Sequence, residues 1–388
     1  MQDTPRSNRL HISFFGRTNS GKSTLLNNLA GQEVSIVSEV EGTTTDPVYK
    51  AMELLPIGPV VLIDTAGFCD KTELGGKRLE KTLEVIKKTD LAIVVIPSYI
   101  DEFSEEEKYI SLLKENKVKT VCVYNLFDKT EKVLPFELPT LSIDASDVLK
   151  MPEFKKFLIE NADTDFENPS LTGHLVKAGD TVILVAPQDI QAPKGRLILP
   201  QVQTIRDLLD NNCKVILIKP DDLKDTLDNL KTPPDLVIVD SQIFKAVNEI
   251  LPKEISLTSF SVIMSRNKGD IDSFLEGAKV LSTLKVGDRV LIMESCTHHS
   301  LPDDIAREKL PKLLEKFIGG KLLIDYFSGQ GFPKNIQDYK LILHCGGCMI
   351  NRKNMLSKIS EAERYKVPIT NFGIAIAYMN KIIDRIVL

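Results

Sequence analysis

The chain has 388 residues, of which 43% are apolar and 27% are charged. These fractions are typical of a globular protein and exclude a disordered, collagen-like or coiled-coil chain. The length predicts two or three domains. The net charge of -5, without clusters of basic residues, argues against a nucleic-acid partner.

Six cysteines are too few for a disulfide scaffold in a chain of this size. The first residues lack the apolar stretch of a signal peptide. The apolar runs are strand-sized and too short to span a membrane. We therefore expect a cytoplasmic protein with reduced thiols and no membrane partner.

The first part of the chain, residues 1–165, alternates short apolar runs with amphipathic stretches. This alternation predicts an α/β domain with a mostly parallel sheet covered by helices on both faces. Strands are expected at 10–15, 60–64, 91–96, 118–124 and 138–143, and helices at 22–29, 76–88 and 104–115.

A polar, turn-rich segment near residue 165 predicts a domain boundary. The second α/β unit, 166–254, has strands expected at 181–187, 214–220 and 235–240, with helices at 200–209, from 221, and at 241–250. A small sheet of this kind leaves an edge that suits pairing with another copy of the chain. The third α/β unit, 255–388, has strands expected at 255–264, 289–293, 321–327 and 339–344.

Residues 16–23 read GRTNSGKS and match G-x-x-x-x-G-K-[ST] between an expected strand and an expected helix. The glycines let the backbone curl so that its N–H groups point at phosphate oxygens. Lys22 is expected to bridge the β- and γ-phosphates, and Ser23 to bind Mg²⁺. The nucleotide-binding residues expected in this loop are Gly16, Asn19, Ser20, Gly21, Lys22, Ser23 and Thr24.

Two further segments complete the expected catalytic set, which is Lys22, Thr44, Asp64 and Gly67. Asp64 ends a buried strand, where it can hold Mg²⁺ through water, and the Gly67 N–H can sense the γ-phosphate. Thr44 lies in a Gly-Thr-Thr-Thr-Asp segment, so its hydroxyl can complete the Mg²⁺ shell when this loop closes.

The segment Asn125-Leu126-Phe127-Asp128 indicates guanine as the base, because an Asp at its end can accept both guanine N–H groups. Ser142 opens the segment after the last strand, whose backbone N–H groups are available to guanine O6. This ordered set of motifs resembles the translation-factor-like GTPases of the TrmE, Era and EngA group.

The chain departs from that group at two positions. Leu126 stands where the group has Lys, which implies modest affinity for GTP. Phe68 stands where Ras-like proteins carry the water-positioning Gln, so hydrolysis is expected to be slow. Asn19 matches the position that binds a monovalent cation in the potassium-stimulated members, and the resemblance therefore implies stimulation by K⁺.

Cysteine and histidine gather in two short stretches, Cys296-Thr-His298-His299 and His344-Cys345-Gly-Gly-Cys348. Each stretch follows an expected strand, so neighbouring strands would bring them to one point. Three thiolates with an imidazole suit Zn²⁺, and three thiolates with an exchangeable fourth ligand suit a [4Fe–4S] cluster. Spacing alone does not choose between these metals.

A P-loop GTPase joined to this C-terminal pattern resembles the HydF family of [FeFe]-hydrogenase maturation GTPases. The resemblance implies three units, for GTP hydrolysis, dimerisation and cluster binding, with a [4Fe–4S] cluster on Cys296, Cys345 and Cys348. The fourth ligand would come from His298, His344, a nearby carboxylate such as Asp303 or Asp304, or the cargo.

The same resemblance implies a function and partners. The protein would be a homodimer, or a tetramer formed by the pairing of two such dimers, that receives a transient di-iron precursor from two radical-SAM maturases. It would deliver this precursor to the apo-[FeFe]-hydrogenase, as scaffold and carrier. GTP hydrolysis would then act as a conformational timer.

Two other functions remain open at this stage. One is a zinc-stabilised GTPase of the RNA-modification or ribosome-assembly class. The other is an enzyme with a catalytic Cys–His pair in the third unit. The metal content separates them, since the three proteins would hold iron with sulfide, zinc, or no metal.

Overall fold

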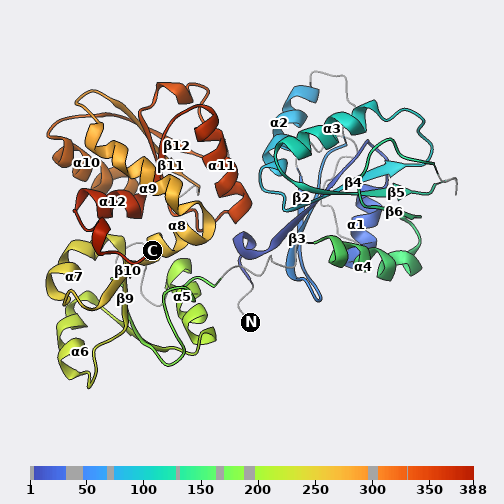
Figure 1. The fold of residues 1–388 in the computed structure, drawn as a ribbon. Helices are drawn as coiled ribbons and strands as arrows, with labels where there is room; N and C mark the ends of the chain where they lie inside the picture. The colour runs from blue at the N-terminus through green and yellow to red at the C-terminus, as the bar shows by residue number, and fades with distance from the viewer. Residues whose placement is uncertain are drawn as a thin grey trace. The chain divides into compact units, whose positions relative to one another are not determined.

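The computed structural model describes residues 4–31, 47–67, 74–127, 132–162, 170–187, 197–295, 305–329 and 331–388. The chain divides into two compact units, 1–167 and 168–388. Each unit is an α/β structure, as the sequence predicts (Figure 1). Within the described residues, no helix combines the length and the apolar character that crossing a membrane requires.

The first unit is built on a six-stranded sheet with the order β2-β3-β1-β4-β5-β6. The β2–β3 pair is antiparallel and the other pairs are parallel. The strands are β1 Leu10–Phe15, β2 Val48–Leu54, β3 Gly58–Asp64, β4 Leu91–Pro97, β5 Lys119–Asn125 and β6 Thr140–Ile143; the helices are α1 Lys22–Ala30, α2 Leu74–Ile86, α3 Ser104–Glu115 and α4 Met151–Asn161.

Side chains that alternate along these strands build two cores on opposite faces of the sheet. Ile12 and Phe14 face α1 and α4, while Phe15 belongs to the core under α2 and α3. Figure 1 shows these two pairs of helices on the two sides of the sheet. The expected elements of this unit are confirmed. The structure adds β2, an edge strand whose side chains are mostly half-buried or exposed, and α4.

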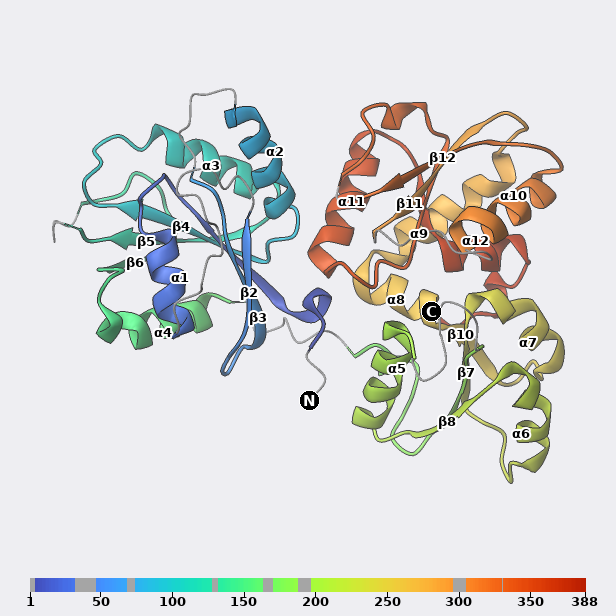
Figure 2. The same cartoon turned by 180° about the vertical axis from the view of Figure 1, so that it is seen from behind.

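The second unit contains two four-stranded parallel sheets, with the orders β10-β9-β7-β8 and β12-β11-β13-β14. Figure 2 shows α5 on one side of the first of these sheets and α6 and α7 on the other. The elements of the first sheet region are β7 Thr181–Val185, α5 Leu199–Asp210, β8 Lys214–Ile218, α6 Leu223–Asn229, β9 Leu236–Val239, α7 Phe244–Ile250, β10 Ser256–Ser259 and α8 Phe260–Lys268.

The second sheet region follows in the chain and carries four more helices. Its elements are α9 Ile271–Lys279, β11 Arg289–Glu294, α10 Leu310–Ile318, β12 Leu323–Ser328, β13 Leu341–His344, α11 Arg352–Arg364, β14 Ile369–Asn371 and α12 Phe372–Met379. The strands expected at 289–293, 321–327 and 339–344 are confirmed.

The strand expected over 255–264, as part of the third unit, is corrected by the structure. Only Ser256–Ser259 is a strand, β10, and it pairs with β9 in the earlier sheet. The remainder opens α8, because the Ser259 side chain accepts the backbone N–H of Val262 and caps the helix. A continuous apolar run does not distinguish a buried strand from a buried helix.

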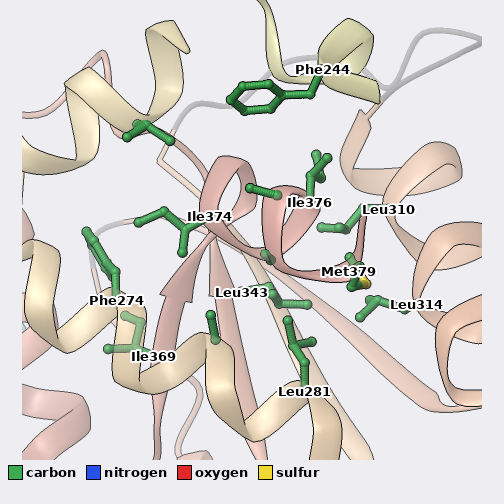
Figure 3. Close-up of a cluster of buried hydrophobic side chains, with 14 of the residues drawn as sticks. Phe244, Phe274, Leu281, Leu310, Leu314, Leu343, Ile369, Ile374, Ile376 and Met379 are labelled. Carbon is green, nitrogen blue, oxygen red and sulfur yellow. The ribbon is translucent and has the colours of Figure 1, made fainter. Parts of the chain in front are cut away.

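The two sheets of the second unit share one hydrophobic core. Val237 and Phe244 belong to the same buried cluster as Leu343 and Ile369 of the other sheet. Helix α12 is apolar on nearly all sides and buried between them. Figure 3 shows its residues Ile374, Ile376 and Met379 among side chains from the surrounding helices, with Phe244 nearby; the other labelled members are Phe274, Leu281, Leu310, Leu314, Leu343 and Ile369. The last residues of the chain also return to β10, where the Val387 N–H donates to the Leu257 carbonyl.

Substitution of Gly277 tests the packing of α9 against β14. A Cβ at this position would overlap the carbonyl oxygen of Ile369, so Gly277→Ala should destabilise the second unit by roughly 1–3 kcal/mol. We expect its Tm to fall by several degrees in scanning calorimetry. Gly331→Ala, which meets no atom within 4 Å, is the matched control, and equal Tm values for the two variants would contradict this account.

Candidate functional site

The P-loop lies between β1 and α1 and has a conformation that requires its glycines. Gly21 has a φ of 96°, and a Cβ there would overlap the amide nitrogen of Asn125. A Cβ on Gly16 would overlap the carbonyl oxygen of Val95. Asn19 has a φ of 61°, which Asn adopts more readily than most residues. The loop therefore folds as the motif predicts, ahead of the N-terminus of α1.

Lys22 lies in the first turn of α1 and folds back over the loop. Its Nζ donates to the carbonyl oxygens of Gly16 and Arg17, at 3.0 and 2.7 Å. Burial lowers the pKa of Lys22 to about 8, and the nearby Asp64 carboxylate partly opposes this shift. The ammonium is thus held at the loop with little solvent around it, where it can meet a phosphate.

Asp64 and Ser23, the expected Mg²⁺ residues, are in contact. The Ser23 Oγ donates to Asp64 Oδ2 at 2.5 Å. Burial raises the pKa of Asp64, while this hydrogen bond and the Lys22 charge lower it. The other carboxylate oxygen, Oδ1, is buried with no hydrogen-bond partner among the described residues. Oxygen atoms in this arrangement fit the coordination preferences of Mg²⁺, whereas Thr44, the other expected ligand, lies outside the described residues.

Gly67 also lies against the P-loop. A Cβ on Gly67 would clash with the backbone nitrogen and the hydroxyl of Thr18, at 2.5 Å from each. The end of β3 therefore brings Asp64 and the backbone of Gly67 to the same loop, as their expected roles require. Thr24 follows Ser23 in α1 and is exposed.

At the part of the site where the guanine base is expected to bind, Asn125 forms hydrogen bonds that connect three segments of the chain. Its Nδ2 donates to the Ser20 carbonyl at 3.0 Å, and its Oδ1 accepts the Ala145 N–H at 2.9 Å. Ser142 is exposed on β6, the strand paired with β5. Leu126, in place of the Lys of the related GTPases, packs against the core under α2 and α3. Asp128 lies outside the described residues.

Two features of this region were not predicted from the sequence. Arg17 of the P-loop makes two hydrogen bonds to the fully buried Glu106 of α3, at 2.6 and 2.8 Å. Tyr99 and Phe127, both about half exposed, pair with ring centroids 5.4 Å apart, and the Tyr99 hydroxyl lies 3.5 Å from the Asn19 carbonyl. The sequence offers only weak signals for these contacts. Many chains have an arginine in such a loop and aromatic residues just after strands, without these contacts.

The two cysteine stretches follow strands that are direct neighbours. β11 pairs with β13, with Met293 opposite His344. The Ser295 N–H donates to the Cys345 sulfur at 3.3 Å, and the Cys345 N–H donates to the Met293 carbonyl at 2.9 Å. The two strands are therefore neighbours, which is the condition under which the two stretches are expected to meet. Cys296 follows Ser295 directly in the chain, and it lies outside the described residues, as does His298.

His344 is fully buried at the end of β13. Its Nδ1 lies 2.7 Å from the Cys345 carbonyl, and its Nε2 lies 3.3 Å from the Ser295 hydroxyl. Burial, reinforced by the charge of Lys358, lowers the pKa of His344 to about 3. The neutral ring thus contacts both strand ends, and both of its nitrogens have partners in the structure.

The Cys345–Cys348 loop leads from β13 into α11. Burial is the main cause that raises the pKa of both thiols, and the two cysteines are close enough for Cys345 to raise the pKa of Cys348 further. Within the described ranges, no three metal-ligating side chains converge on one point. The two thiols and the N–H directed at sulfur fit the ligand preferences of a soft metal.

The lowered pKa of Lys22 makes nucleotide binding take up a proton. Phosphate charge next to Lys22 raises its pKa from about 8, so binding at about pH 8.5 should absorb more than half a proton, and much less at about pH 7. Calorimetry of GTP binding in two buffers of different ionisation enthalpy measures this uptake. Equal uptake at both pH values would contradict the assignment.

Family models of known proteins match both units of the chain. Residues 11–126 match the family model of a 50S ribosome-binding GTPase. Residues 171–269 match that of the hydrogen maturase F dimerization domain, and residues 272–388 that of the hydrogen maturase F tetramerization domain.

Individual relatives resemble the first unit. The tRNA modification GTPase MnmE of Legionella pneumophila (strain Paris) is 33% identical over 156 residues, 38% of this chain and 34% of the relative. GTPase Der of Sulfurimonas denitrificans is 36% identical over 129 residues, 32% of this chain and 26% of the relative. The chain thus spans about a third or less of these relatives.

Among solved structures, Aquifex aeolicus Era bound to GDP and aluminium fluoride matches with 21% identity and a TM-score of 0.34. The match covers 54% of this chain and 92% of that one. The first unit is a P-loop GTPase domain, and residues 171–388 carry the two domains that define a single family. The chain belongs to the hydrogen maturase F family.

Proposed function

We propose that this chain is a GTP-hydrolysing iron–sulfur scaffold that carries a di-iron precursor to apo-[FeFe]-hydrogenase. The observation that carries the proposal is the juxtaposition of Ser295, next to Cys296, with Cys345 at the ends of two paired strands. It occurs in a chain that also has a P-loop GTPase domain and the hydrogen maturase F domains.

In the first unit, Lys22 and the P-loop backbone hold the phosphates, and Ser23 and Asp64 hold Mg²⁺. The contact between Ser23 and Asp64, with Lys22 beside them, supports these roles. Thr44 closes over the metal, Asp128 and Ser142 recognise guanine, and Gly67 senses the γ-phosphate. Hydrolysis releases GDP and phosphate and serves as a timer for the carrier.

In the second unit, Cys296, Cys345 and Cys348 hold a [4Fe–4S] cluster. When bound, a cluster held by three thiolates supplies one iron with a replaceable ligand, to which the precursor can bind. The Ser295 N–H donates to the Cys345 sulfur and stabilises its thiolate. Because both nitrogens of His344 have partners at the strand ends, we assign the fourth position to His298, a carboxylate or the cargo.

The chain acts with copies of itself and with other proteins. The dimerization and tetramerization domains support self-association. The β8 edge strand, with Leu217 41% exposed, offers a surface for pairing between copies. We propose that two radical-SAM maturases supply the precursor in the cytoplasm and that apo-[FeFe]-hydrogenase receives it.

Anaerobic reconstitution tests the cluster directly. The purified chain should bind about four irons and give the EPR signal of a reduced [4Fe–4S] centre with dithionite. Cys345→Ala should lose this signal, whereas Lys22→Ala, the control in the other unit, should keep it and lose GTP hydrolysis. Stoichiometric zinc without an EPR signal would make the chain a zinc-stabilised GTPase instead.

We propose that potassium stimulation depends on Asn19, a P-loop residue in the left-handed conformation. GTP turnover should be several-fold faster in KCl than in NaCl, because K⁺ beside the phosphates supplies the charge of an arginine finger. Phosphate release measured in the two salts at equal ionic strength checks this. Asn19→Ala should remove the difference, and equal rates in wild type would exclude the role.

A further inference from the structure

Two lysines are buried within the second unit near the Cys345–Cys348 loop. Lys268, at the end of α8, and Lys358, in α11, are each 2% exposed. Lysine is rarely buried to this extent, because removing an ammonium from water is costly unless the surroundings compensate. Buried charge of this kind marks places where a protein has to balance charge of the opposite sign.

Lys358 lies at the carboxyl end of the β12-β11-β13-β14 sheet. Its Nζ donates to the Gly329 carbonyl at 3.1 Å, just after β12, and lies 5.5 Å from the centre of the Phe332 ring. β12 and β13, the strand that ends at His344, are the two neighbours of β11. β11 runs between those two strands and leads directly to Cys296. Lys358 therefore lies near the end of β11, the strand that leads to Cys296, which is the proposed third thiolate ligand.

The end of α8, which carries Lys268, contacts the segment that follows the loop. Arg352, four residues after Cys348, donates to the carbonyl oxygens of Asn267, at 2.5 Å, and Gly269, at 3.2 Å. These two residues flank Lys268, so the end of α8 is fastened to the segment that follows Cys348.

We propose that Lys268 and Lys358, buried near the cysteine loop, stabilise the negative charge of a cluster bound there. The inference rests on the proposed function and adds a role for these lysines to it. A [4Fe–4S]²⁺ core held by three thiolates carries one net negative charge, and one-electron reduction makes it two. Two buried cations therefore favour the reduced form and raise the reduction potential.

The test is the midpoint potential of the reconstituted cluster, measured by EPR during a dithionite titration. Lys358→Met and Lys268→Met should each make the one-electron reduction equilibrium at least tenfold less favourable, a shift of about 59 mV to lower potential. Lys358→Arg, which keeps the charge, should stay near the wild-type potential. Lys340→Met is the matched control, because Lys340 is exposed at the opposite end of β13.

Each outcome is decisive. Unchanged potentials in both methionine variants, with iron at the wild-type level, would overturn the role of the lysines and leave the proposed function intact. A wild type that binds no [4Fe–4S] cluster would overturn both. If circular dichroism shows that a methionine variant is unfolded, the glutamine variant replaces it, because its side chain retains a donor for nearby carbonyls. Its midpoint potential is then interpreted in the same way. If a methionine variant is folded but does not bind iron, and the arginine variant at the same position does bind iron, the result supports the proposal.

Discussion

Parallel pairing of neighbouring strands is the constraint on which both candidate sites depend. In a parallel sheet the carboxyl ends of all strands lie on one edge, so residues far apart in the chain meet there. In the first unit β1 leads to the P-loop, β3 to Asp64 and β5 to Asn125. In the second unit β11 leads to Ser295 and β13 to Cys345. One topological rule thus assembles a phosphate site and a thiol site of unrelated chemistry.

The polar groups at these edges are buried, and the fold compensates the cost of burying them. Asn125 joins the Ser20 carbonyl to the Ala145 N–H, so both halves of its amide are satisfied. Lys22 has carbonyl oxygens around its ammonium, and the buried ring of His344 is kept neutral between two strand ends. Such arrangements hold ligand-binding groups in place before any ligand arrives, which reduces the entropy lost on binding.

The second unit combines two sheets in one core, so the two sheets depend on the same packing. Helix α12 is buried between the sheets, and the C-terminal residues pair with β10 of the sheet that comes first in the chain. A displacement of one sheet therefore has to repack side chains that also support the other, because close-packed cores deform little.

The sequence alone determined the P-loop, the expected nucleotide residues, most strands and the family resemblance, because these depend on local patterns of glycine, charge and apolar periodicity. It also predicted that Cys345 and the segment before Cys296 converge. It misplaced residues 255–264, since an apolar run reads alike in a buried strand and a buried helix. Tertiary structure alone decided that Glu106 anchors Arg17, that His344 is buried between strand ends, and that Lys268 and Lys358 are buried. Each of these depends on contacts between distant segments, and such contacts leave no local pattern in the chain.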